Sequence, residues 1–218
     1  MRAGPTGSNF REKWPEVDWP RQFRYLSSLV IRGQVYSFFW LLWHCGLATN
    51  AWVAKRTGHG HSPACTHCGA PEKDIEHLFI NCPAAQEMWN QLSTSWQTWI
   101  GVTPPVPSQE TLTLSGPKPG YPAAYDTLVA HTLWSIWIRR NALQFQNEAI
   151  PCLTAWQSVI RCFVSSMAAS TKRSKGSRQM WTPFGKWIDD STLNWEATLS
   201  FLTGNARVNP LREESETD

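Results

Sequence analysis

Cysteine and histidine gather in one short segment, and this segment constrains the fold more than any other feature of the chain. The order is CxxC, then a histidine, then a cysteine, and the four residues are Cys65, Cys68, His77 and Cys82. A CxxC turn places two thiolates on one side of a metal ion, and a second pair of ligands can close a tetrahedron, the geometry that zinc favours. The spacing therefore predicts a structural zinc site with no coordination position left for a substrate or a reactive water.

Other histidines lie close to this pattern and leave the fourth ligand open to alternatives. His59, His61 and His67 are each candidates to replace His77. His77 and Cys82 can reach one ion if a helical turn starts near Glu76 and loosens before Pro83. The alternative interpretation, buried thiols beside a surface histidine, would suit a lone CxxC better than four ligand-type residues so close together. The remaining cysteines, Cys45, Cys152 and Cys162, are expected to be buried thiols.

Composition indicates a folded chain outside the membrane. The 14 tryptophans among 218 residues favour a small, aromatic-rich core. Residues 1–10 lack the apolar stretch of a secretory signal, and the apolar run at 38–47 is shorter than the roughly 20 residues that a membrane span needs. We therefore expect an intracellular protein, nuclear or cytoplasmic, with no membrane partner. In a reducing compartment clustered cysteines serve as metal ligands rather than as disulfides.

Proline, glycine and hydrophobic periodicity predict a mainly α fold, in which a small zinc-stabilised helical module precedes a helical hairpin and both termini are disordered. The segment at 101–122 holds six prolines and three glycines without periodic hydrophobicity, which is typical of a linker. The predicted parts are a flexible arm (1–20), a zinc-binding domain (21–100), the Pro-rich linker (101–122), the helical hairpin (123–170), a basic loop with a short helix (171–203) and a disordered tail (204–218).

Two stripes of large side chains support the helical hairpin. The first follows i, i+3, i+7, i+11 spacing and comprises Trp134, Trp137, Asn141 and Phe145. The second, after Pro151, follows the similar helical spacing i, i+4, i+7, i+11 and comprises Trp156, Ile160, Phe163 and Met167. Such spacing places each set on one face of a helix. We expect the two helices to form an antiparallel pair that buries these faces against each other.

Charge is segregated along the chain. Residues 1–61 and 123–180 are net positive, whereas 62–122 and 181–218 are net negative. Segregated positive charge suits a polyanionic partner, although a solvated basic surface that binds nothing gives the same pattern. The candidate nucleic-acid-binding residues are Lys55, Arg56, Arg139, Arg140, Lys172, Arg173, Lys175 and Arg178.

The order of motifs resembles a known domain. The aromatic run at 38–49, Trp52, Lys55 and Arg56, the CxxC, the segment at 76–79, Cys82-Pro83 and Trp89 are together similar to the zinc-binding domain that follows the polymerase in non-LTR retrotransposon proteins. The later segment at 133–145 resembles what often trails that domain. The resemblance implies that the four Cys and His residues bind zinc, that the module assists binding of template RNA or target DNA, and that a reverse transcriptase domain encoded upstream is a partner.

Catalytic patterns do not stand out. The Asp189-Asp190 pair lacks the rest of a polymerase palm and is interpreted as a cap of a helix near Ser191. No GxSxG elbow, phosphate-binding glycine loop or HExxH is found. We therefore expect a non-catalytic nucleic-acid-binding accessory module, with the choice between RNA and single-stranded DNA left open. The alternative is a protein-interaction or self-association module that uses the Trp-rich hairpin.

Overall fold

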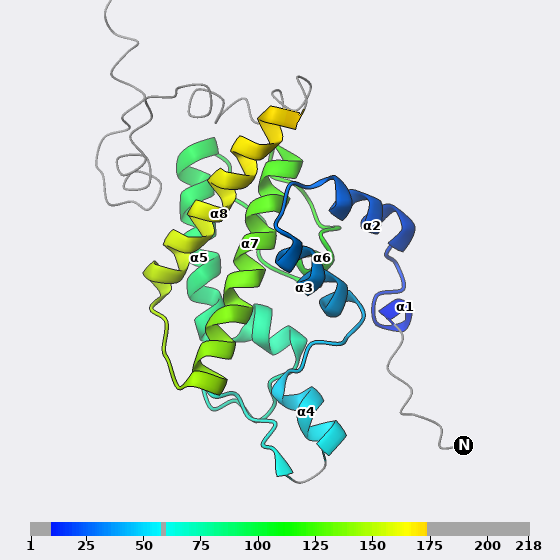
Figure 1. Cartoon of the computed structure of the whole chain (residues 1–218), viewed down its shortest axis with the longest axis vertical. Coiled ribbons are helices and arrows are strands. Elements are labelled where there is room, and N and C mark those ends of the chain that lie inside the picture. The colour runs from blue at the N-terminus through cyan, green and yellow to red at the C-terminus, as the bar shows by residue number, and fades with distance from the viewer. Residues whose placement is uncertain (1–9, 58–59, 174–218) are drawn as a thin grey trace, which may run out of the picture. The chain divides into compact units, whose positions relative to one another are not determined.

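A computed structural model of the chain describes residues 10–57 and 60–173 (Figure 1). Within these ranges the protein is mostly helical and contains no strand, so the mainly α prediction is confirmed. None of the helices in the described part is long and apolar enough to cross a lipid bilayer. The predicted disordered tail at 204–218 and most of the predicted basic loop at 171–203 lie outside the described residues.

The chain forms two compact units. The first comprises residues 1–86 and 107–116, and the second comprises 87–106 and 117–218. This division places 87–100 with the second unit and 107–116 with the first, whereas the sequence pattern suggested a single zinc-binding domain over 21–100 and a linker over 101–122. That the expected domains fold independently of one another stays a prediction.

The first unit is built from short helices. They are α1 (Phe10–Lys13), α2 (Trp19–Ser28), α3 (Gly33–Trp43), α4 (Asn50–Thr57), a π-helical turn η2 (His77–Asn81) and α6 (Gln109–Thr113). Helix α5 (Pro83–Ile100) begins in this unit and ends in the second. Proline at the first position of α5 loses no hydrogen bond there, because the first N–H groups of a helix have no partner within it.

Aromatic side chains form the core of the first unit. The Trp43 ring is fully buried on α3, and the Trp19 ring on α2 meets it edge to face at 5.5 Å between centroids. Trp14 is also buried, and its ring lies 5.9 Å from that of Trp19. Residues 10–20 therefore do not extend as the flexible arm that the Gly and Pro content suggested. Burial of two tryptophans stabilises the packed state of this segment more than its turn-forming residues oppose it.

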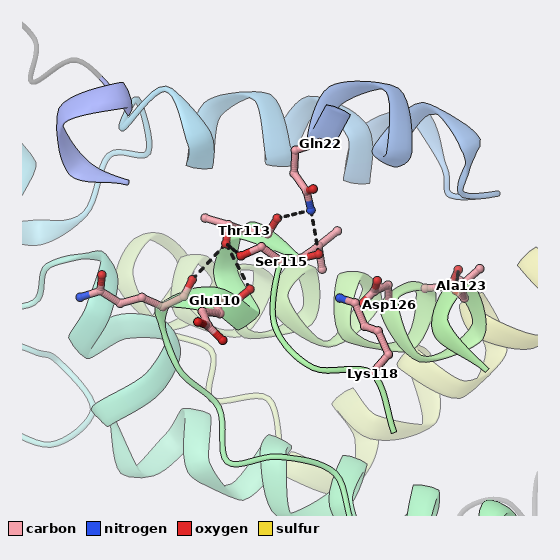
Figure 2. A network of polar contacts seen from close by, with 10 residues as sticks. Gln22, Glu110, Thr113, Ser115, Lys118, Ala123 and Asp126 are labelled. Carbon is pink, nitrogen blue, oxygen red and sulfur yellow. Dashed lines mark hydrogen bonds and ion pairs between the residues drawn. The ribbon is translucent and has the colours of Figure 1, made fainter. Parts of the chain in front are cut away.

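Side-chain amides connect α6 to the rest of the first unit. The Gln22 Nε2 donates to the carbonyl oxygens of Thr113 and Leu114 at 2.6 and 2.7 Å, as Figure 2 shows for Thr113. The Trp43 Nε1 donates to the Leu112 carbonyl at 2.9 Å. Part of the predicted linker is thus a packed helix, since Leu112 and Leu114 bury apolar surface that the Pro and Gly content did not reveal.

The second unit contains α7 (Pro122–Asn141), a π-helical turn η3 (Ala142–Gln146) and α8 (Cys152–Arg173), packed with the later part of α5. Helices α7 and α8 lie side by side and run in opposite directions (Figure 1). Trp96 of α5 meets Tyr125 of α7 at 5.2 Å, and Trp99 of α5 stacks on Phe163 of α8 at 6.1 Å. A buried ion pair between Lys118 and Asp126, 2.7 Å long, joins the chain before α7 to its first turns (Figure 2).

Only one of the two predicted stripes faces the core. Trp156, Ile160, Phe163 and Met167 are all fully buried, as expected. In the first stripe, however, Trp134 and Trp137 are half-buried and Phe145 is 71% exposed. For Phe145 the reason is η3: a π turn carries more residues per turn than an α-helix, so residues beyond Asn141 leave the face that regular spacing assigned to them. Trp134 and Trp137 precede this turn, and η3 does not account for their exposure.

Candidate metal centre

The four cysteine and histidine residues of the sequence pattern converge on one point. The thiol sulfurs of Cys65, Cys68 and Cys82 and a ring nitrogen of His77 all lie within 4.8 Å of one another. The Cys65 and Cys82 sulfurs are 3.8 Å apart, and the Cys68 sulfur is 3.4 Å from the His77 Nε2. Cys65 and Cys82 are buried whereas Cys68 is exposed. All four belong to the first unit, and together they form a Cys3His group that can hold a metal ion.

The CxxC pair is held by a tight backbone turn. The Gly69 N–H donates to the Cys65 carbonyl at 2.9 Å, and the Cys65 N–H donates to the Ala70 carbonyl at 2.8 Å. Gly69 has a φ of 74°, in the left-handed region, where a side chain would be strained. These bonds fold the chain back on itself, so the sulfurs of Cys65 and Cys68 point toward the same centre.

The second pair of ligands is positioned by the π-helical turn η2. The Cys82 N–H donates to the His77 carbonyl at 2.7 Å, which is the i to i+5 bond of a π turn. The Asp74 carboxylate accepts from the His77 N–H at 2.7 Å and so fixes the start of this turn. The Cys82 carbonyl then accepts the Ala85 N–H as α5 begins. The five-residue spacing between the ligands is therefore one wide helical turn, and both side chains reach the same centre.

Helix α4 anchors the loop that carries the CxxC turn. The Asn50 side chain donates to the Ala64 carbonyl at 2.6 Å, directly before Cys65. The Ala51 N–H donates to the Lys73 carbonyl at 3.2 Å, and the Lys73 N–H donates to the Pro63 carbonyl at 2.8 Å. Asparagine at the start of a helix commonly caps it, but here the Thr49 hydroxyl accepts the Trp52 N–H instead. The only sequence signal for the anchoring role was a polar residue directly before the apolar first turn of α4.

The electrostatics of the group favour a cation at its centre. Burial raises the pKa of the Cys65 thiol, but hydrogen bonds from the Cys68 and His67 backbone and the His77 side chain, with the charge of Lys73, outweigh it and lower the pKa overall. For Cys82, burial and the charges of Cys65 and Cys68 raise the pKa of the thiol. One thiol loses its proton readily, and the resulting thiolate opposes ionisation of the next thiol, because negative charge accumulates at one point. A bound dication would stabilise the thiolates and so favour ionisation of all three thiols.

The alternative ligands do not join the group in the described residues. His67 lies within the CxxC turn but is not among the four convergent donors. The His61 Nδ1 lies 3.2 Å from the Thr57 hydroxyl. His59 lies outside the described residues. Within the described part, His77 is therefore the histidine that completes the group.

The predicted nucleic-acid-binding residues fall into different environments. Lys55 and Arg56 are exposed on α4; Lys55 forms an exposed ion pair with Glu72 at 3.3 Å, and the Arg56 guanidinium lies 4.2 Å from the centre of the Trp52 ring. Lys172 and Arg173 are the last residues of α8, while Lys175 and Arg178 lie outside the described residues. The structure thus leaves Lys55 and Arg56 available to a partner.

Arg139 and Arg140 are placed differently. Arg139 is 8% exposed, and its guanidinium contacts the Glu87 carboxylate at 3.2 Å and the Ile150 carbonyl at 3.1 Å. Arg140 is 2% exposed and lies over the Trp137 ring at 5.1 Å. Both side chains are engaged inside the second unit, so little of their charge faces solvent there. Sequence alone could not reveal this, since Glu87 is far from Arg139 along the chain.

Three thiols and one imidazole that converge on one point form a candidate metal site. In a comparison with known families, residues 8–89 match the model of the family described as zinc-binding in reverse transcriptase. The matched range contains all four convergent residues, and the resemblance seen in the sequence is confirmed over it. Searches of curated proteins and of solved structures gave no match.

Proposed function

We propose that the chain is a structural-zinc, nucleic-acid-binding accessory module of the post-polymerase type, non-catalytic by itself. The observation that carries the proposal is the geometry of the Cys3His group. Zinc forms bonds of ~2.3 Å to sulfur and ~2.0 to 2.1 Å to nitrogen at tetrahedral angles. This geometry places two sulfur ligands ~3.8 Å apart, and a sulfur and a nitrogen ligand ~3.5 Å apart. The separations of 3.8 Å between Cys65 and Cys82 and 3.4 Å between Cys68 and His77 fit these edges.

The same geometry supports a structural rather than a catalytic ion. Catalytic zinc keeps one coordination position for water or substrate, whereas four protein ligands fill all positions of a tetrahedron. Three thiolates also give the complex a net charge of about −1, which weakens its ability to polarise a substrate. Zinc would here hold the CxxC turn to η2 and so fold the first unit.

Charge in the first unit supports a nucleic-acid partner. Between Asp18 and Glu72 the sequence contains five arginines and lysines and no aspartate or glutamate. This acid-free segment includes α2, α3 and α4, and the exposed Lys55 and Arg56 lie in it. Positive charge without interspersed carboxylates attracts phosphates at long range. The partners that we propose are RNA or single-stranded DNA and a reverse transcriptase domain encoded upstream.

The salt dependence of binding to a labelled single-stranded oligonucleotide tests this function. Each lost phosphate contact reduces the slope of log affinity against log salt by about 0.7 on single strands. Replacing Lys55 and Arg56 with serine should lower the slope by up to about 1.4, and replacing Lys172, Arg173, Lys175 and Arg178 by up to about 3. The matched control is Lys13→Ser with Arg161→Ser, two exposed positions outside the acid-free segment.

Each result bears on the proposal. An unchanged slope in the Lys55 and Arg56 variant would remove α4 from the binding surface, and an unchanged slope in the second variant would remove the basic segment that starts at Lys172. A parent protein that binds neither RNA nor DNA at low salt would contradict the nucleic-acid function itself. Zinc content should stay equal in all variants, because none of the altered residues is a ligand.

A protein-interaction function is the second candidate, and three exposed apolar side chains favour it. Ile138, Phe145 and Leu153 in the second unit are 38%, 71% and 45% exposed. Exposed apolar side chains of this size are typical of contact surfaces. Self-association would appear in sedimentation velocity as a concentration-dependent species that Phe145→Ser abolishes and that salt does not affect. A monomer at all concentrations would leave the nucleic-acid function as the better account.

A further inference from the structure

Trp40 is more exposed to solvent than the other tryptophans at the N-terminal end of the first unit. Trp14, Trp19 and Trp43 are buried, whereas Trp40 on α3 is 50% exposed. The indole is nonetheless held in place from one side. Its ring stacks on the His44 ring at 4.0 Å between centroids with an interplanar angle of 29°, and the Phe23 ring of α2 lies at 5.6 Å.

These contacts fix the orientation of the exposed ring. The His44 Nδ1 lies 2.7 Å from the Trp40 carbonyl, one helical turn earlier, which restrains the imidazole under the indole. Phe23 contacts His44 as well, with 5.9 Å between ring centroids. A large flat apolar surface thus faces solvent with little rotational freedom, so a ligand that stacks on it loses little side-chain entropy.

The helix that carries Phe23 also carries exposed positive charge. Arg24 follows Phe23 on α2 and is exposed, as is Arg21 one turn earlier. The nearest carboxylates along the chain are Asp18 and Glu72, so the whole segment from α2 to α4 lacks acidic residues. An exposed aromatic ring in an acid-free segment with exposed arginines complements a nucleobase that is attached to a phosphate, because the ring stacks on the base while the cations attract the backbone.

We propose that Trp40 is a stacking platform for an unpaired base of single-stranded nucleic acid, with Arg21 and Arg24 facing the neighbouring phosphates; this inference rests on the proposed nucleic-acid function and assigns its binding surface. A duplex does not fit such a platform, since its bases already stack on one another and expose only their edges. The absence of acidic residues in the segment favours a polyanion over an apolar protein surface as the occupant.

Fluorescence anisotropy with oligonucleotides that contain or lack bases tests the platform. The probes are a labelled oligouridylate and a labelled oligothymidylate of roughly 16 nucleotides, and an abasic strand of the same length and charge. Trp40→Ala should weaken binding of the base-containing strands by about 5- to 100-fold and leave binding of the abasic strand unchanged. Trp40→Phe should restore most of the loss. Phe145→Ala is the matched control, because that ring is also exposed but lies in the second unit.

The outcomes separate the platform from the proposed function. Normal binding of all strands by Trp40→Ala would overturn the platform and leave the nucleic-acid function standing. An equal loss on the abasic strand, or no recovery in Trp40→Phe, would assign Trp40 to folding and also overturn it; the thermal midpoint and zinc content of each variant report that case directly. A parent protein that binds none of the strands would overturn both. Loss of self-association in Trp40→Ala with unchanged strand affinity would assign the ring to a protein contact instead.

Discussion

Asn50 and Lys73 show how single residues outside the ligand set shape the metal centre. The Asn50 amide donates to the carbonyl of Ala64, which precedes Cys65. Lys73 lies between the two ligand pairs in the sequence, and its side chain is fully buried. Burial raises the pKa of the Cys65 thiol, whereas the nearby hydrogen bonds and the charge of Lys73 lower it. Neither residue belongs to a ligand pattern, so sequence reasoning identified the ligands and missed their support.

Asn50→Ala should destabilise the zinc-loaded protein by about 1 to 3 kcal/mol, because the partly buried Ala64 carbonyl loses its donor. Urea unfolding of the variant and the parent at equal zinc concentration measures the difference. Asn90→Ala, at an exposed position on α5, is the control and should change stability by less than about 0.5 kcal/mol. Equal stability of Asn50→Ala and the parent would contradict the anchoring role of α4.

Gly69→Ala should cost about 1 to 2 kcal/mol, because the φ of 74° lies in the region that L-residues avoid. A Cβ at Gly69 would meet no atom within 4 Å, so the cost comes from backbone strain and not from a clash. Gly69→Asn should cost less, since asparagine tolerates this conformation. The rate of zinc release to a chelator provides the measurement. If Ala and Asn behaved alike, strain at Gly69 would not be what holds the turn.

At the scale of elements, the regular periodicity of α8 was readable from the sequence and the π turn η3 was not. The buried stripe of α8 follows from its spacing alone. The turn η2 agrees with the expectation of a loosened helical turn between His77 and Cys82. The turn η3 carried no such signal, because no metal ligand marked its ends. Face assignments therefore failed where a wide turn interrupted the 3.6-residue period.

Tryptophans on the two facing helices should differ in their contribution to stability. Trp156→Ala on α8 should cost about 3 to 5 kcal/mol, because the ring is fully buried. Trp137→Ala on α7 should cost only about 1 to 2 kcal/mol, since the ring is half-buried and lies under Arg140. Denaturant unfolding of both variants compares them. A larger loss at Trp137 than at Trp156 would contradict the helical faces described above.

At the scale of the whole molecule, the ligand pattern and helical content followed from the sequence, whereas the division into units did not. Segments 1–86 and 107–116 form one unit although a stretch of chain separates them. Proline and glycine content marked 101–122 as a linker because local composition does not reveal the burial of Leu112 and Leu114. The ion pair between Arg139 and Glu87 was hidden for the same reason, because 52 residues of chain separate the two partners.

Removal of zinc should affect the two units differently. Zinc binding in comparable modules contributes an apparent ~10 to 16 kcal/mol, which is similar to or larger than the stability of a whole domain. After chelation, the amides of the CxxC turn and η2 should lose protection from hydrogen exchange, while those of α7 and α8 should keep most of theirs. Equal protection before and after chelation across residues 62–82 would show that the metal does not stabilise the first unit.

X-ray absorption at the zinc edge is the most direct test of the central claim, that Cys65, Cys68, His77 and Cys82 hold one structural zinc ion. The protein refolded with zinc should contain one ion per chain, with three sulfur ligands at ~2.3 Å and one nitrogen at ~2.0 to 2.1 Å. Cys82→Ser should lose a sulfur ligand or the ion itself. Failure to retain zinc after refolding, a shell with fewer than three sulfurs, or a spectrum unchanged in Cys82→Ser would contradict the claim.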